Sequence, residues 1–293
     1  MIAPWLLWTL LALASWGVWA LLSKLIGDAL SPAQSQALST IGLVPVIAGL
    51  ALSRKLGAGG HRTRGVVFAF AAGVLTCIGN IAYYGVLNSG AKAATVVPLT
   101  AMYPLVTMLL AVMLLKETLN RIQVIGIVLS LVAIYLFNVQ QEQRVLSTWL
   151  FVAMVPVALW GISGLLQKIS TNSISGELSA LWFLLAFVPV ALVLIAREPL
   201  PSRISPRSWF LVIILGLTFA FGNFAILLAF ASHGKASIIA PLAGLYPVVS
   251  IPLAVVALGE RIGPREWTGI VMALCAVAAI SIESKTPAVQ PAS

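Results

Sequence analysis

Two similar stretches carry side chains whose types and spacing point to the binding of a small molecule. They are AKAATVVPLTAMYPLV (91–106) and GKASIIAPLAGLYPVV (234–249), which place a lysine, a proline and a Tyr-Pro pair at the same spacing. Both stretches are otherwise apolar, and a phenol surrounded by hydrocarbon needs a hydrogen-bond partner. A cavity shared by the two stretches would supply such partners.

Tryptophan and asparagine side chains repeat in the same paired way. Trp16 matches Trp160 and Asn80 matches Asn223, and all four fall within apolar runs. Their indole and amide groups predict one amphipathic cavity, to which Tyr83 is also assigned. The alternative is structural, because asparagine also joins neighbouring helices and tyrosine also shapes their packing. The candidate cavity residues are Trp16, Asn80, Tyr83, Tyr103, Trp160, Asn223 and Tyr246.

Prolines and lysines in the two stretches are candidates for hinges and gates. A proline inside a spanning helix frees a carbonyl group and bends the helix, which a cavity or a neighbouring helix tolerates. Lys92 and Lys235 each begin one of the repeated helices, and each either extends to the membrane surface or gates one mouth of the cavity. The candidate hinges are Pro98, Pro104, Pro241 and Pro247.

Two glutamates, Glu117 and Glu260, end the same repeated helices. A carboxylate at the C-terminus of a helix opposes the helix dipole, so each glutamate is expected to have a cationic partner. Arg121 and Arg265 are the candidate partners because they follow shortly in the sequence.

Several kinds of chemistry are disfavoured by what the apolar runs lack. No Asp or Glu lies in the middle of a run, which favours a neutral, zwitterionic or anionic substrate over a lipophilic cation exchanged for protons. GISG (161–164) resembles the serine motif of intramembrane proteases, but His61 and His233 are the only histidines and lie outside the runs. The chain has no P-loop. We therefore expect no catalytic residue, no enzyme activity and no ATP-driven pump.

Composition defines the broad class. Of the 293 residues, 60% are hydrophobic and 9% charged, with a mean hydropathy of +1.06, whereas soluble domains carry about a quarter charged residues. The net charge of +9 lies in short gaps between apolar runs, where basic residues orient membrane proteins, so no nucleic-acid partner is expected. Cys77 and Cys275 lie in apolar runs and are interpreted as small apolar residues, with no metal site and no cofactor.

Apolar runs of spanning length can be counted directly, and they predict an all-α integral membrane protein in a lipid bilayer. The first run is expected to stay as a membrane helix, because it lacks the basic start and cleavage site of a signal peptide. The gaps between runs are too short for a soluble catalytic domain. The ten predicted spans are 4–26, 33–53, 65–88, 92–115, 121–139, 148–169, 177–196, 207–231, 235–258 and 264–283.

The ten spans form a tandem repeat of five helices each. Residues 79–133 and 222–276 are identical at 21 of 55 positions at an offset of 143, and the offset becomes 144 upstream. An odd number of helices per repeat predicts that the two halves are inverted in the membrane, an architecture typical of secondary transporters. The predicted domains are 1–139 and 148–283, followed by a disordered tail at 284–293.

Loop charges set the expected orientation. Basic residues of the first half favour a cytoplasmic N-terminus, whereas those of the second half oppose it because they copy the first half. Early helices usually dominate, so we expect a multi-pass protein of the cell inner membrane with both termini cytoplasmic.

The repeated motifs resemble those of the drug/metabolite transporter superfamily, and of its EamA-type members in particular. SWGVWALLSK opens the first half, and GKASIIAPLAGLYPVVSIPLAVVALGE is similar to the end of an EamA repeat. The first copy departs in having Ala91 where the second has Gly234. The resemblance implies a ten-helix bundle with a central cavity, alternating access by rocking of helix groups, and hinges at the prolines.

The resemblance also implies the kind of substrate. Relatives export amino acids or other metabolites, and eukaryotic cousins exchange nucleotide sugars or sugar phosphates. We therefore expect a carrier that exports small amphipathic compounds such as amino acids, working as a monomer or homodimer. The alternatives are an uptake carrier, an anion or sugar-phosphate exchanger that uses the two lysines, and a membrane scaffold or sensor.

Overall fold

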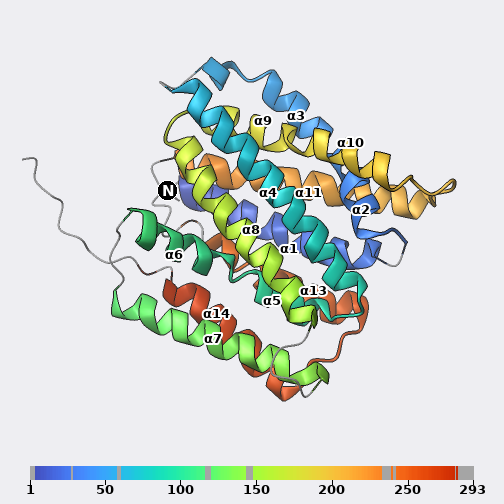
Figure 1. Cartoon of the computed structure of the whole chain (residues 1–293), viewed down its shortest axis with the longest axis vertical. Coiled ribbons are helices and arrows are strands. Elements are labelled where there is room, and N and C mark those ends of the chain that lie inside the picture. The colour runs from blue at the N-terminus through green and yellow to red at the C-terminus, as the bar shows by residue number, and fades with distance from the viewer. Residues whose placement is uncertain are drawn as a thin grey trace, which may run out of the picture.

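The computed structural model describes residues 4–27, 29–57, 61–115, 120–142, 148–232, 239, 242–280 and 282. Within these ranges the chain forms helices and no strand (Figure 1). The helices of the first half are α1 (Pro4–Ile26), α2 (Pro32–Ser39), η1 (Thr40–Leu43), α3 (Val44–Ala51), η2 (Arg54–Gly57), α4 (Arg62–Asn88), α5 (Ala93–Thr100), α6 (Tyr103–Leu115) and α7 (Arg121–Glu142). Those of the second half are α8 (Thr148–Thr171), α9 (Gly176–Leu185), α10 (Phe187–Arg197), α11 (Pro206–Ala231), α13 (Pro247–Leu258) and α14 (Pro264–Ile280).

In the part of the chain that the structure describes, six helical segments are long and apolar enough to cross a membrane. Large apolar side chains such as Leu192, Phe210 and Val256 point outward from the bundle, as lipid-facing residues do. The protein is therefore an all-helical, multi-pass membrane protein. The six segments are Pro4–Ile26, Pro32–Ala51, Arg62–Asn88, Leu150–Thr171, Gly176–Arg197 and Pro206–Ala231.

Hydropathy predicts one continuous helix over 92–115 and another over 235–258. The structure instead breaks each of them at a turn. α5 ends at Thr100 and α6 begins at Tyr103, with a turn at 101–102 between them. The second half has the equivalent turn at 245–246, directly before α13. Pro104 and Pro247 lack the N–H group that would continue each helix through the turn. The backbone is thus broken at the same place in both halves.

A second pair of breaks lies in the spans expected at 33–53 and 177–196. The first span changes to a 3₁₀ turn, η1, between α2 and α3. The second stops at Ala186, between α9 and α10. Hydropathy cannot detect these breaks, because the broken segments remain apolar throughout.

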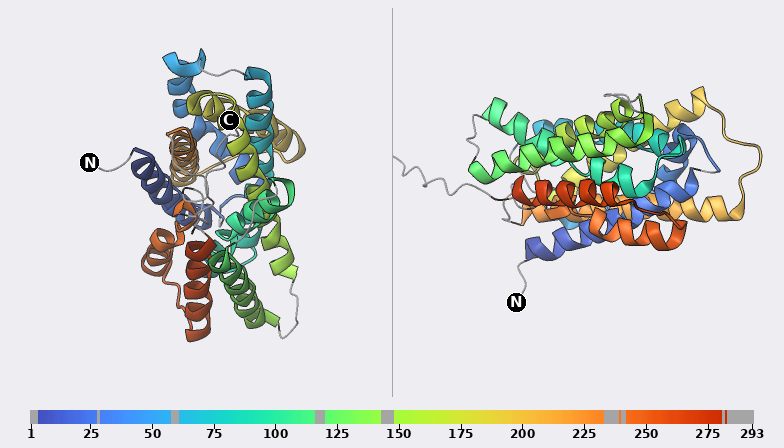
Figure 2. Two further views of the ribbon diagram at one scale, coloured as in Figure 1. Left: turned by 90° about the vertical axis from the view of Figure 1, so that its left-hand side faces the viewer. Right: turned by 90° about the horizontal axis from the view of Figure 1, so that it is seen from below.

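The two halves interlock rather than lie side by side. α1 packs against α11 and α8 packs against α4, so the first helix of each half lies on the other half. Gly216 of α11 leaves room for the carbonyl oxygen of Ser39, and Gly73 of α4 leaves room for that of Phe183. Any Cβ atom at either glycine would collide with the crossing backbone. α7 and α14 pack together along one side of the bundle, away from α3 and α9 (Figures 1 and 2).

Candidate ligand-binding cavity

A cavity lies between the two halves of the bundle. Proteins usually bind small molecules in concave sites lined by aromatic side chains and a few polar groups. Among the described residues, the lining contains no charged side chain, whereas it contains amide, hydroxyl and indole groups. The lining consists of Trp16, Trp19, Thr76, Asn80, Tyr103, Trp160, Ser163, Gly164, Gln167, Phe219, Asn223, Ile226, Phe230 and Tyr246.

Six of the seven candidate cavity residues lie in this lining, and the seventh lies behind it. The ring of Tyr83 stacks on that of Trp19, with ring centroids 5.0 Å apart and planes inclined by 20°. Tyr83 is fully buried and also packs on Trp160, which like Trp19 belongs to the lining. The residues that do line the cavity are Trp16, Asn80, Tyr103, Trp160, Asn223 and Tyr246.

One polar group of the cavity is built around Trp160 on α8. Its indole Nε1–H donates a hydrogen bond to Asn80 Oδ1 at 3.2 Å. The ring also meets Tyr103 edge-on, with centroids 6.3 Å apart. Gly79 of α4 permits this approach, because a Cβ there would lie 2.7 Å from the indole nitrogen. The group joins α8 of one half to α4 and α6 of the other.

The equivalent group around Trp16 is arranged similarly but hydrogen-bonded differently. Trp16 meets Tyr246 edge-on at 6.3 Å and lies against Gly222. Asn223 instead donates its Nδ2–H to the carbonyl oxygen of Phe219 at 2.9 Å. The Trp16 Nε1–H consequently has no hydrogen-bond acceptor among the described residues. The nitrogen is itself buried, and it lies against Gly222 of α11.

A hydroxyl and amide cluster that the sequence interpretation missed lines the cavity beside Trp160. Ser163 Oγ lies 2.7 Å from Thr76 Oγ1 and donates to the carbonyl oxygen of Ala72 at 3.0 Å. Gln167 Nε2 donates to Ser163 Oγ at 3.3 Å. Ser163 and Gln167 stand one helical turn apart on α8, and this spacing is the sequence signal that could have found them. The GISG serine is thus part of the cavity lining.

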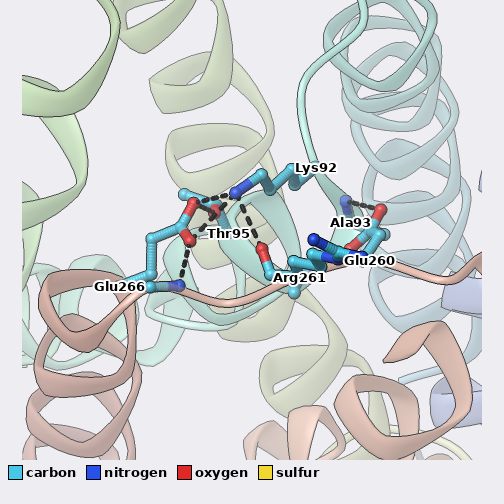
Figure 3. Close-up of polar contacts among 8 residues, drawn as sticks. Lys92, Ala93, Thr95, Glu260, Arg261 and Glu266 are labelled. Carbon is cyan, nitrogen blue, oxygen red and sulfur yellow. Dashed lines mark hydrogen bonds and ion pairs between the residues drawn. The ribbon is translucent and has the colours of Figure 1, made fainter. Parts of the chain in front are cut away.

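Lys92 forms a charged contact outside the cavity, at the junction of the two halves (Figure 3). Its Nζ lies 2.8 Å and 3.0 Å from the two carboxylate oxygens of Glu266 on α14, and it donates to the carbonyl oxygen of Arg261 at 2.9 Å. Glu266 is buried and also accepts the backbone N–H of Gly263 at 2.7 Å. Lys92 is therefore held by the second half rather than extended freely into solvent.

Glu260 has a different partner from the arginine expected for it. Its carboxylate accepts the backbone N–H groups of Ala93 and Ala94, at 2.8 and 2.9 Å (Figure 3). The positive end of the α5 dipole thus compensates the carboxylate. Gly259, in the left-handed conformation with φ of 65°, ends α13 and turns the chain toward α5. Glu117, the equivalent of Glu260, lies outside the described residues.

The candidate hinges occupy different positions around the helix breaks. Pro98 lies inside α5, Pro104 is the second residue of α6, and Pro247 is the first residue of α13. Pro241 and Lys235 lie outside the described residues, as does the tail at 284–293.

The cavity lies between two interlocked halves of a helical membrane protein, which is the arrangement of a membrane transporter. The chain matches the EamA-like transporter family twice, over residues 3–139 and 147–282. It therefore belongs to the EamA-like transporter family and consists of two repeats of that family. Transport rather than an enzymatic reaction is the activity that membership indicates.

Two further comparisons describe relatives of this chain. A stretch of 74 residues is 40% identical to an uncharacterized protein of Methanocaldococcus jannaschii. The stretch covers 25% of this chain and 53% of that protein, so the chain spans about half the length of the curated relative. A solved crystal structure aligns with 93% of this chain and 94% of its own, at 21% identity and a TM-score of 0.66. At that identity the likeness shows a shared fold alone.

Proposed function

We propose that this protein is a secondary carrier that exports amino acids or related small amphipathic metabolites across the cell inner membrane. The observation that carries the proposal is the uncharged, polar and aromatic cavity between the two repeats. In this proposal ten spans form two inverted repeats, both termini are cytoplasmic, and the cavity opens alternately to either side. Equivalent residues from both halves line the cavity, which is what two equivalent openings require.

The lining supports a neutral or zwitterionic substrate over a phosphorylated one. An anion exchanger needs a cation at its binding site, and among the described residues no Lys or Arg lines the cavity. The ammonium group of Lys92 lies in an ion pair with Glu266 instead. The indole, hydroxyl and amide groups of the lining supply both donors and acceptors for a head without net charge.

Lys92, Glu260 and Glu266, here called the Lys92 latch, have the geometry of a gate between the halves. They join the start of α5 to Glu260 in the loop after α13 and to Glu266 in the first turn of α14. The breaks before Tyr103 and Pro247 allow α5 to move without α6, and the loop to move with α13. In the proposed cycle, release of the Lys92 latch opens the cavity at this end of the bundle, and its formation closes that opening.

Flux measured in proteoliposomes tests the proposal. The purified protein is reconstituted with a trapped mixture of amino acids, nucleosides, sugar phosphates and amines, and efflux is followed by mass spectrometry. Loss of amino acids at a rate above that of empty liposomes is expected. The matched control is Ile226→Trp, which enlarges a side chain of the cavity lining and is expected to bring efflux to the background. Failure of every solute to move under any gradient would contradict the carrier.

A further inference from the structure

The two halves of the cavity differ at two positions that the internal repeat makes equivalent. At the offset of 144, Ser163 of α8 is equivalent to Trp19 of α1, and at the offset of 143, Thr76 of α4 is equivalent to Phe219 of α11. All four side chains line the cavity. Thr76 and Ser163 touch each other, and so do Trp19 and Phe219, with ring centroids 5.6 Å apart. The pair that α4 and α8 contribute is thus a hydroxyl pair, whereas the equivalent pair from α11 and α1 is aromatic.

Hydrogen positions in the hydroxyl pair follow from its partners. The Ser163 hydroxyl donates its only proton to the carbonyl oxygen of Ala72, so Thr76 must donate to Ser163. Gln167 also donates to Ser163 through one N–H. Its second N–H and its Oε1 have no partner among the described residues, and the side chain borders the cavity. Gln167 can therefore offer a donor and an acceptor to a ligand.

The aromatic pair forms an extended apolar wall. Phe219 also packs on Phe187, with ring centroids 5.2 Å apart, and Ile226 and Phe230 continue the lining along α11. Such a surface binds apolar groups, at about 25 cal/mol per Å² removed from water.

We propose that the cavity binds its substrate in one orientation, with a donor-and-acceptor head at Gln167, which Ser163 and Thr76 hold in place, and an apolar group against Trp19 and Phe219. The proposal rests on the proposed function, because it names the substrate class of the same site. The substrate is an uncharged or zwitterionic compound with one apolar end.

Binding of four probes to the full-length protein in lipid nanodiscs tests the orientation. L-leucine and L-alanine share a zwitterionic head and differ in apolar size. Isoamylamine and isocaproate keep the leucine side chain with a cationic or an anionic head. Dissociation constants are measured by calorimetry for the wild type and for two variants. Gln167→Met removes the polar groups at similar size, and Phe219→Thr inserts the residue that the other half has at this position.

The expected pattern separates the two ends of the cavity. Gln167→Met weakens the binding of leucine and of alanine by the same factor, about tenfold. This factor corresponds to the loss of one hydrogen bond to a charged head. Phe219→Thr weakens the binding of leucine about tenfold and changes the affinity for alanine less than twofold, because the side chain of alanine does not reach the aromatic wall. Phe219→Leu, a milder change, gives the same pattern with a smaller effect if the threonine variant does not fold.

Three outcomes would overturn the orientation. They are equal weakening of leucine and alanine by the Phe219 variant, tighter binding of isoamylamine or isocaproate than of leucine, and binding of none of the four probes by the wild type. The flux measurement and the binding measurement test different proposals, so one can be contradicted without the other. Leucine that binds with the expected pattern but does not cross the bilayer would contradict the carrier and leave the orientation intact.

Discussion

At the scale of single residues, the cavity shows how one pair of equivalent tryptophans can have different surroundings. The indole N–H of Trp160 donates a hydrogen bond to Asn80 Oδ1. The indole N–H of Trp16 has no acceptor among the described residues, and Asn223 bonds to its own helix instead. A buried amide oxygen that loses its donor is costly, while an indole with no partner loses little when its N–H is removed. The two sites therefore form a matched experiment.

Trp160→Phe is expected to lower the stability of the folded protein by about 1 kcal/mol more than Trp16→Phe. Both changes remove a similar volume of ring, but only the first leaves Asn80 Oδ1 without its donor. Thermal unfolding of both variants in the same nanodiscs measures the difference. Equal losses would mean that the hydrogen bond contributes nothing net in this membrane protein.

At the scale of elements, the start of α5 is the place where the two halves are tied together. The Glu260 carboxylate caps α5 from the opposite half, and its charge lies at the positive end of the helix dipole. A sequence motif that ends one repeat thereby stabilises the beginning of a helix in the other. Such a cap typically contributes about 0.5–2 kcal/mol.

Glu260→Ala is expected to speed hydrogen exchange at the amides of Ala93 and Ala94, while exchange in the middle of α4 stays unchanged. The reason is that both amides lose their acceptor. Glu260→Gln retains an acceptor without the charge and should give an intermediate rate. Exchange measured by mass spectrometry on the α5 peptide tests this. Unchanged protection in the alanine variant would show that the cap is not maintained in the membrane.

At the scale of the whole molecule, the two ends of the bundle differ in charge although the repeat makes them equivalent. Glu266, which pairs with Lys92, is equivalent to Gln123 at the offset of 143. Both side chains accept the N–H three residues earlier, at the start of their own helices. A carboxylate is present at one end and a neutral amide at the other, so closure of the two openings is expected to differ in strength.

Glu266→Gln is expected to open the cavity toward the Lys92 latch. We propose to follow the labelling rate of Ile226→Cys, a lining position, with a membrane-impermeant maleimide added from each side. Cys275 is exposed and is first replaced by serine, whereas Cys77 is buried. Labelling from the side of the Lys92 latch should rise about fivefold, the factor that 1 kcal/mol represents.

Gln123→Glu is the matched control for this change. It adds a carboxylate at the equivalent position of the other half and leaves Lys92 and Glu266 untouched. The labelling rate from the side of the Lys92 latch should therefore not fall. Identical labelling rates in the wild type and in Glu266→Gln, from both sides, would show that the Lys92 latch does not control access to the cavity.

Much about this protein follows from the sequence by itself. The helical membrane class follows from hydropathy, and the doubling follows from the offset of 143 to 144, because both are properties of residue order alone. The repeat also selected Trp16, Asn80, Tyr103 and their equivalents, six residues that all line the cavity. Polar side chains paired across a repeat can be found without knowing any contact.

Only the tertiary structure decided which further residues line the cavity, those without a chemically similar equivalent in the other repeat. Ser163, Gln167 and Phe219 have no equivalent of the same chemistry, so repetition could not select them, and they reach the cavity from helices that meet only in the folded bundle. The same holds for Glu260, whose partner amides lie 166 and 167 residues away in the chain. Composition and repetition are carried by the order of residues, whereas the sides of the cavity and the partner of each charge arise from packing between distant segments.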